Sequence, residues 1–340
     1  MVGSDPKPMS ELNSERVLVR IVREVAARTG VAVEPLGHGW ILRLTKGPRV
    51  RYVHGYTFDL NPAATHQIAC DKAATSEVLA AIGIAHVPHE LFLHPDMARY
   101  VRHDGNWSRL LALVQRLGGD VVIKDNAGTG GRGVYRCTST IAVEHACLRL
   151  FDRCPALAVS PFVDAAEEVR FIILDGRCEA AYTKQRPSVT GDGRRTVLEL
   201  LAERVTRAGM SGDIARFLTN IEPDSAAILT RTPSTGQELL LNWRHNLGQG
   251  AGVAMLDVSA IATGPFAAAQ ALALRAAAGV GLVFGSVDVI INRAAVAQVL
   301  EINSGVMMEA LAVTPQGNQT AKRIYARAFE LMFSSAPSVS

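Results

Sequence analysis

The segment Gly118–Cys137, with the sequence GGDVVIKDNAGTGGRGVYRC, decides the fold class of this chain. Its apolar residues predict one strand over Val121–Lys124 and another over Val134–Cys137, joined by a glycine-rich loop. This strand–loop–strand order differs from the strand–loop–helix order of Rossmann and Walker phosphate loops. The glycines would let backbone N–H groups close around an anion, and Lys124 would place its ammonium group against it. We therefore predict a phosphate-binding hairpin, with a flexible hairpin tip as the alternative. Its glycines are Gly128, Gly130, Gly131 and Gly133.

Three oxygen-bearing side chains near the carboxyl end form a second pattern. Strands are predicted over 286–292, which carries Asp288, and over 298–303, which carries Glu301 and Asn303. Residues i and i+2 of a strand share one face, so Glu301 and Asn303 should point together. Two carboxylates and an amide oxygen are ligands that Mg²⁺ prefers. The pattern predicts a magnesium site, and a pair of solvated surface strands is the alternative.

A third pattern is the stretch NWRHNLGQGAG, residues 242–252. Arg244 and Asn246 are again two residues apart, and three glycines follow them. An arginine and an amide beside a glycine-rich turn suit a group that carries negative charge transiently, such as an acyl phosphate. His245 lies between the two and should point the opposite way, which favours a core or surface position for it.

Other histidines gather in a proline-containing segment at His86, His89 and His94. Because Pro88 disfavours a shared helical face, we predict solvated or locally bonded loop histidines rather than a metal site.

Strands and helices alternate along the chain without an internal repeat. Apolar residues recur at helical spacing in several segments, and glycines or prolines bound them. We predict an α/β (α+β) architecture in several lobes. The expected helices cover 14–28, 71–82, 108–117, 140–152 and 310–333.

Composition excludes few functions but sets the class of protein. Among 340 residues, 48% are hydrophobic and 20% charged, and the net charge is +3. So small a charge does not favour a nucleic-acid or membrane partner. No apolar run reaches the length of a membrane span, and the five cysteines are scattered without a CxxC pair. Reduced thiols and a cytoplasmic location are expected.

Six stretches in fixed order resemble the ATP-grasp superfamily, in particular its branch with cyanophycin synthetase, bifunctional glutathione synthetase and the ribosomal-protein glutamate ligases. They span roughly residues 61 to 305, about three quarters of the chain. The stretches are DKAATSEVLAAIGIAHVP, VVIKDNAGTGGRGV, SPFVDAAEEVRFIILDG, KQRPSVTGDGRRTVLELL, RHNLGQG and DVIINRAAVAQVLEINSG.

The resemblance implies an ATP site. Lys72 and Lys124 look like the lysines that hold phosphates, beneath the glycine loop. The hinge strand, with Ser160, Phe162 and Val163, would read the adenine through its backbone, and Glu168 would take the ribose hydroxyls.

The resemblance also implies roles around the reacting groups. Arg170 looks like the arginine that faces the phosphates or the acyl group, and Arg186 like a substrate-side arginine. Arg244 and Asn246 match a pair over the reacting carboxyl phosphate. The Mg²⁺ ligands would be Asp288, Glu301 and Asn303, with Mn²⁺ as an alternative ion.

The sequence departs from the family pattern at three places. Ser160 replaces an acidic residue or glutamine at the start of the hinge, and Ala165–Glu167 replaces the glycine before the ribose acid, so Glu167 could serve instead of Glu168. After Asn303, Gly305–Met308 replaces the usual proline-glycine. That segment should border the acceptor site, and its two methionines are expected to pack against a substrate pocket.

The resemblance implies a three-lobe fold with ATP between two α+β lobes. The expected divisions are a tail at 1–15, an N-terminal lobe at 16–95, a lid lobe at 96–160 and a C-terminal lobe at 161–335. The implied activity is that of a carboxylate–amine ligase, which uses Mg-ATP to make an acyl phosphate that an amine attacks. A kinase-like phosphotransferase and a non-catalytic nucleotide-binding regulator are the alternatives. The partners would be small acids and amines, with a homodimer or homotetramer expected.

Overall fold

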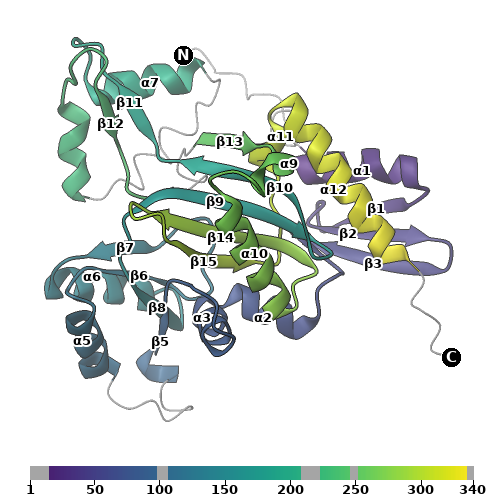
Figure 1. Ribbon diagram of the computed structural model, residues 1–340, viewed down its shortest axis with the longest axis horizontal. Coiled ribbons are helices and arrows are strands. Elements are labelled where there is room, and N and C mark those ends of the chain that lie inside the picture. The colour runs from purple at the N-terminus through teal and green to yellow at the C-terminus, as the bar shows by residue number, and fades with distance from the viewer. Residues whose placement is uncertain (1–14, 98–105, 208–222, 246–251, 335–340) are drawn as a thin grey trace, which may run out of the picture.

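The computed structural model describes residues 15–97, 106–207, 223–245 and 252–334. Their strands form four sheets flanked by helices, as Figure 1 shows. This mixture confirms the predicted α/β (α+β) class.

The largest sheet lies at the centre and is antiparallel throughout, with strand order β13-β10-β9-β14-β15. In the sequence, the pair Asp175–Gly176 between two apolar runs predicts a hairpin, and the structure confirms it: both residues adopt positive φ and join β9 to β10. The strands are β9 (Ala165–Leu174), β10 (Arg177–Gln185), β13 (Gly252–Leu256), β14 (Phe284–Asn292) and β15 (Ala297–Asn303).

The two faces of this sheet have different neighbours. One face carries Phe171, Ile173 and Val287, and helix α10 (Ala267–Val280) covers it. The other face is apolar at one end, where Ile172 packs under helix α12 (Pro315–Phe333), and becomes charged further along the same strands. Alternate residues of a strand share a face, so Arg170 lies on the same face of β9 as Ile172, and the charged residues extend the apolar part of that face.

The N-terminal layer joins this second face. Helix α1 (Val17–Thr29) packs along α12 and on the sheet β1-β2-β3-β4. Phe58 of β4 stacks on Tyr325 and meets Phe284 edge-on, with ring centroids 5.1 Å apart in each pair. These aromatic contacts fasten the layer to the central sheet. Its strands are β1 (Ala32–Leu36), β2 (Ile41–Lys46), β3 (Arg49–His54) and β4 (Thr57–Phe58).

The glycine-rich hairpin belongs to a separate sheet, with order β5-β8-β6-β7. Its strands pair as predicted, with Val121 opposite Cys137. Strand β5 (Glu90–Leu93) pairs with β8, so this strand lies with the predicted lid although we placed the lobe boundary near residue 95. The other elements are β6 (Val121–Asp125), β7 (Val134–Cys137), β8 (Ala156–Pro161), α5 (Asn106–Arg116) and α6 (Thr140–Phe151).

Smaller elements complete the described chain. Helices α2 (Ala63–Cys70) and α3 (Lys72–Ala81) lie between the N-terminal layer and the lid sheet. No helix of the described segments is long and apolar enough to cross a membrane. The remaining elements are β11 (Ser188–Thr190), α7 (Val197–Arg207), the 3₁₀ helix η2 (Pro223–Thr230), β12 (Glu238–Leu240), α9 (Val258–Ile261) and α11 (Glu309–Ala312).

Candidate functional site

A cavity of about 550 Å³ is lined by residues of the central sheet, the lid sheet and the N-terminal layer. This volume is typical of a site for a small molecule. Most of the residues predicted for ATP, metal and acyl binding line it. They are Lys72, Lys124, Gly128, Gly130, Gly131, Ser160, Phe162, Val163, Glu168, Arg170, Arg244, Asp288, Glu301 and Asn303.

Its floor is a network of buried charges on neighbouring strands. Arg170 of β9 lies opposite Asp288 of β14 and donates to both of its oxygens, at 2.7 Å each. Lys184 of β10 donates to Asp288 at 2.8 Å and to Glu168 at 2.5 Å. All four side chains are buried or nearly so. The floor therefore holds two cations and two carboxylates that compensate one another.

These contacts decide the protonation of both acids. Burial would raise the pKa of Asp288, but Arg170 and Lys184 outweigh burial and hold that pKa below its usual range. Burial dominates at Glu168 and raises its pKa, although Lys184 opposes the effect. Asp288 thus stays ionised, while Glu168 is the acid in this network that protonates first as pH falls.

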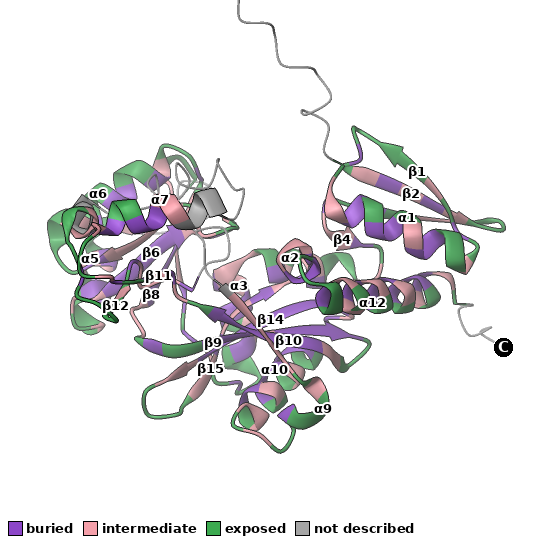
Figure 2. Ribbon diagram, turned by 90° about the horizontal axis from the view of Figure 1, so that it is seen from above, coloured by how far each residue is buried: buried purple, intermediate pink, exposed green. Residues whose placement is uncertain are grey.

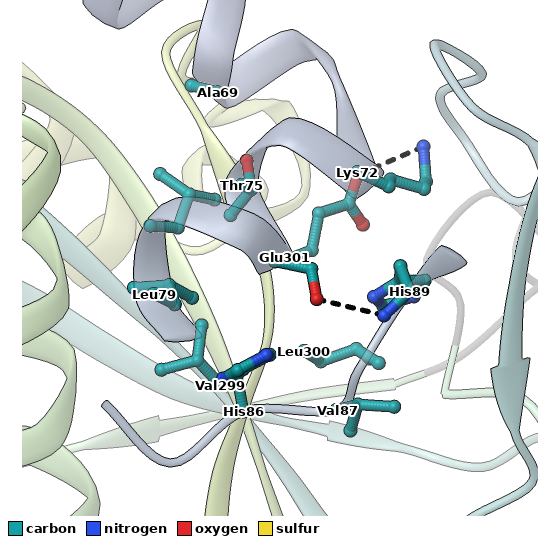
Figure 3. A pocket seen from close by; sticks show the side chains of 12 residues that line it. Ala69, Lys72, Thr75, Leu79, His86, Val87, His89, Val299, Leu300 and Glu301 are labelled. Atoms are coloured by element: carbon teal, nitrogen blue, oxygen red, sulfur yellow. Dashed lines mark hydrogen bonds and ion pairs between the residues drawn. The ribbon is translucent and has the colours of Figure 1, made fainter. Parts of the chain in front are cut away.

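The two predicted phosphate lysines lie on the lid side of the cavity. Lys124 is buried, and burial together with the charge of Lys72 lowers its pKa to about 8. Lys72 donates to the carbonyl of Gly128 at 2.5 Å and lies 3.7 Å from a carboxylate oxygen of Glu301, a contact drawn in Figure 3. Two ammonium groups side by side in a partly dry site favour an anionic ligand.

Asn126 fixes the glycine loop to the start of α3. Its backbone carbonyl accepts from the N–H of Lys72 at 3.2 Å, and its side-chain oxygen accepts from the N–H of Ala73 at 3.0 Å. Within the loop, a Cβ on Gly128 would lie 2.8 Å from Cβ of Asp125, so only glycine fits there. Gly133 is not among the lining residues; its φ is +62° and a Cβ would approach Leu150 at 2.8 Å. We infer that glycine is needed at position 133 for the shape of the loop rather than for contact with a ligand.

The prediction of solvated or locally bonded loop histidines holds through its second alternative, because His89 is buried rather than solvated. His86 and His94 bond locally as expected, to the carbonyl of Ile84 and to Asp96. The ring of His89 bonds to the backbone of Val87, two residues away, and lines a small pocket that Lys72 also lines, drawn in Figure 3; its Nε2 has no hydrogen-bond partner within the described residues. Burial, then the charges of Lys124 and Lys72, hold the pKa of His89 well below its ordinary value. The side chain is therefore neutral.

The hinge strand brings an aromatic pair to the cavity. The guanidinium of Arg136 lies 3.5 Å from the ring centroid of Phe162, and Trp243 meets Phe162 edge-on at 5.5 Å. Such flat surfaces suit a planar ring. Between the two candidate ribose acids, Glu168 lines the cavity and Glu167 is exposed to solvent.

The stretch around Arg244 differs in part from its prediction. Arg244 and His245 both line the cavity, so the expectation that His245 points away into core or surface is wrong. Burial and the charge of Arg186 lower the pKa of His245 to about 4, and its Nε2 accepts from Arg186 at 3.2 Å. Arg186 does not itself line the cavity, and it contacts the site through this hydrogen bond to His245. Asn246 lies outside the described residues.

The predicted metal ligands are brought together at the edge of the charge network. Asp288 lies opposite Glu301 in the β14–β15 pair, and Asn303 follows two residues later. No group of three or more His, Cys, Asp and Glu side chains arranged for a metal occurs in the described part of the chain. Nδ2 of Asn303 is buried without a hydrogen-bond partner, and an amide can be turned to offer its oxygen instead.

This donor set fits Mg²⁺, which is usually held by one or two carboxylates and keeps several waters or phosphate oxygens. Glu301 and Asn303 are available for that role. Asp288 is fully engaged by Arg170 and Lys184, so it can reach a cation only if those side chains shift to another anion.

Two sets of lining residues were not predicted. Lys184 lies inside a quoted motif, and its position two residues after Tyr182 on β10 could have indicated the cavity face. Trp40 and Tyr56 come from the N-terminal layer, where the sequence carries no motif.

Two relatives share part of this sequence. A glutathione biosynthesis bifunctional protein of Lactiplantibacillus plantarum is 30% identical over an alignment of 250 positions that covers 69% of this chain and 31% of that protein. A cyanophycin synthetase of Nostoc is 25% identical over 209 residues, 60% of this chain and 21% of that protein. No protein-family model matches.

Solved structures show the same fold. A bifunctional glutathione synthetase of Pasteurella multocida superposes with a TM-score of 0.53 at 18% identity, covering 92% of this chain and 44% of that one. A D-alanine–D-alanine ligase of Bacillus anthracis gives 0.50 at 13% identity, covering 80% and 68%. The chain belongs to the ATP-grasp superfamily.

The ATP-grasp resemblance inferred from the six stretches is thereby confirmed. This ATP-grasp chain spans about a third of the first curated relative and about a fifth of the second.

Proposed function

We propose that this ATP-grasp chain is an ATP-dependent carboxylate–amine ligase that forms an amide through an acyl phosphate. One observation carries the proposal. Lysines for an anionic nucleotide and two arginines for a reacting carboxyl group line the same cavity, beside Glu301 and Asn303. The ligases among its relatives support the same chemistry.

ATP would lie between the hinge strand and the glycine loop. Phe162 and Trp243 offer flat surfaces to a planar base, and Lys72 and Lys124 would face the phosphates. Binding of phosphate next to Lys124 would raise its pKa again and keep the ammonium charged. Glu168 would either accept hydrogen bonds from the ribose hydroxyls or remain paired with Lys184. Substitution of Glu168 would weaken nucleotide binding directly only in the first case.

We further propose Mg²⁺ as the metal; Glu301 and Asn303 would hold it, and Asp288 would be available to it only if Lys184 and Arg170 bound another anion. A bound Mg²⁺ supplies charge neutralisation on phosphate oxygens. The chain's own groups do the rest: Arg170 and Arg244 compensate charge on the acyl phosphate and on the oxyanion that forms when the amine attacks. The loop from Gly128 to Gly131 excludes water, which would otherwise hydrolyse the acyl phosphate.

The amine's nitrogen forms a bond to the carboxyl carbon, and the bond from that carbon to the phosphate oxygen breaks. Phosphate leaves with the electron pair, and the proton from nitrogen leaves to solvent or phosphate. Positioning suffices for this step, because an acyl phosphate is already activated.

The experiment is phosphate release from Mg-ATP across all pairs of a panel of amino acids and small acids, with mass spectrometry of active wells. We expect release that depends on the pair and a product one water lighter than the two substrates together. A phosphorylated product without free phosphate would instead make the protein a kinase-like transferase. Nucleotide binding without turnover would make it a regulator.

A cytoplasmic location is also proposed. None of the five cysteines forms a disulfide, and three of them, Cys137, Cys147 and Cys154, are buried. Free thiols are typical of a reducing compartment.

A further inference from the structure

Part of the cavity lining comes from the N-terminal layer rather than from the lid sheet. Trp40 and Tyr56 of this layer line the cavity with their ring centroids 6.3 Å apart, and Met307 lines it as well. Met307 follows closely after Asn303, and the loop between them is tied to the layer: the N–H of Val306 donates to the carbonyl of Tyr56 at 3.1 Å. This part of the lining is therefore continuous with the side chains that we assign to the reacting groups.

Trp40 is held in place although it is 49% exposed. The guanidinium of Arg16 lies 4.7 Å from its ring centroid and also donates to the carbonyls of Gly39 and Gly55, the latter at 3.1 Å. Gly55 in turn donates its N–H to the carbonyl of Trp40 at 2.8 Å, and a Cβ on Gly55 would approach the indole at 3.1 Å. The indole is thus fixed from two sides without being buried.

The turn before Trp40 is a tight hairpin turn between β1 and β2. The N–H of Gly39 donates to the carbonyl of Leu36 at 3.1 Å, and Gly37 and His38 between them adopt positive φ, of 53° and 54°, as a primed hairpin turn requires. Such a turn fixes the backbone just before Trp40.

The side chains of Trp40, Tyr56 and Met307 indicate which kind of chemical group could bind against them. An indole face, a phenol ring and a thioether offer apolar contact. Burial raises the pKa of Tyr56 to about 12, so its phenol is neutral. The guanidinium of Arg16 also lies 5.3 Å from the Tyr56 ring, and the carboxylate of Glu309 is close enough to raise the pKa of Tyr56 further, so the two charges balance and the wall favours an uncharged occupant.

We propose that Trp40, Tyr56 and Met307 form a substrate subsite for an aromatic or large apolar side chain, next to the reacting groups. The proposal rests on the ligase function and narrows its substrate class: one of the two joined molecules carries an uncharged aromatic or bulky apolar group.

The test is calorimetric binding in the presence of Mg-ADP, with L-phenylalanine and 3-phenylpropanoate as large probes, L-alanine and propanoate as their small counterparts, and L-lysine as a basic one. We expect at least one large probe to bind at least tenfold more tightly than its counterpart and than L-lysine. Trp40→Ala should remove that preference, Trp40→Phe should keep most of it, and affinity for Mg-ADP should stay unchanged in both.

Tyr52→Ala is the matched control. Tyr52 lies on the neighbouring strand β3, is 48% exposed and does not line the cavity, so its loss should leave probe affinities unchanged. Equal affinity for large and small probes in the wild type would overturn the subsite, as would an unchanged preference in Trp40→Ala. Because binding is measured without turnover, a protein that releases no phosphate with any pair contradicts the ligase function separately.

Discussion

Lys184 is the residue whose loss tests the charge network most sharply. Its side chain is only 6% exposed and its ammonium bridges Glu168 and Asp288 at 2.5 and 2.8 Å. In Lys184→Met, the stem volume is kept while two buried carboxylates face a single cation, Arg170. Breaking a buried ion pair by removing one partner costs about 3–5 kcal/mol of folding free energy. We expect a destabilisation of that order at pH 7.

Denaturant unfolding in the absence of nucleotide measures this loss. The matched control is Lys46→Met, an exposed lysine at the end of β2, which should change stability by less than about 0.5 kcal/mol. The double variant Lys184→Met with Glu168→Gln should recover part of the loss, because it removes one of the two stranded charges. A destabilisation under about 1 kcal/mol for Lys184→Met, or no recovery in the double variant, would refute the description of the network as mutually compensating.

The remaining predictions concern nucleotide and pH. Lys124→Met should stabilise the nucleotide-free protein at pH 7 by about 3 kcal/mol, because a lysine pKa lowered from 10.5 to about 8 means that folding disfavours its charged form. The unfolded state holds more protons between pH 8 and 10.5, so wild-type stability should rise with pH over that window and the variant's should not; parallel curves would contradict the burial of that charge. The same variant should lose at least tenfold in ATP affinity by calorimetry. Glu168→Gln should change nucleotide affinity several-fold, with exposed Glu167→Gln as its control; an effect confined to Glu167 would reassign the ribose contact. Glu301→Gln should abolish the Mg²⁺ dependence of ATP binding, whereas equal Mg²⁺ dependence in wild type and variant would remove Glu301 from the metal site.

Local patterns predicted the parts of the fold that are local in sequence. The hairpins β6–β7, β9–β10 and β14–β15 each join strands that are close along the chain, and turn residues such as Asp175 and Gly176 mark them. Strand β1 was missed because Pro35 interrupts its apolar pattern. The partnership of β5 with β8 depends on strands far apart in sequence, which no local signal reports.

The same distinction explains the site. Glu301 and Asn303 share a strand, so their proximity follows from the period of two. Lys184 on β10 and Asp288 on β14 are far apart in sequence, and strand β9 lies between their strands in the sheet. Their contact therefore depends on the sheet order, and Arg170 of β9 binds the same carboxylate. The burial of His89 and the place of Trp40 in the cavity lining depend on segments far apart in sequence, so the local pattern around Pro88 left the burial of the first open and no pattern indicated the second.

The measurement that tests the central claim most directly uses the acid found by the substrate panel, labelled with ¹⁸O in its carboxyl group. If the carboxylate attacks the γ-phosphorus of ATP and the amine then displaces phosphate, each released phosphate must carry one ¹⁸O atom from the acid, which mass spectrometry of the phosphate detects. Unlabelled phosphate, formed at the same rate as the amide, would contradict activation through an acyl phosphate.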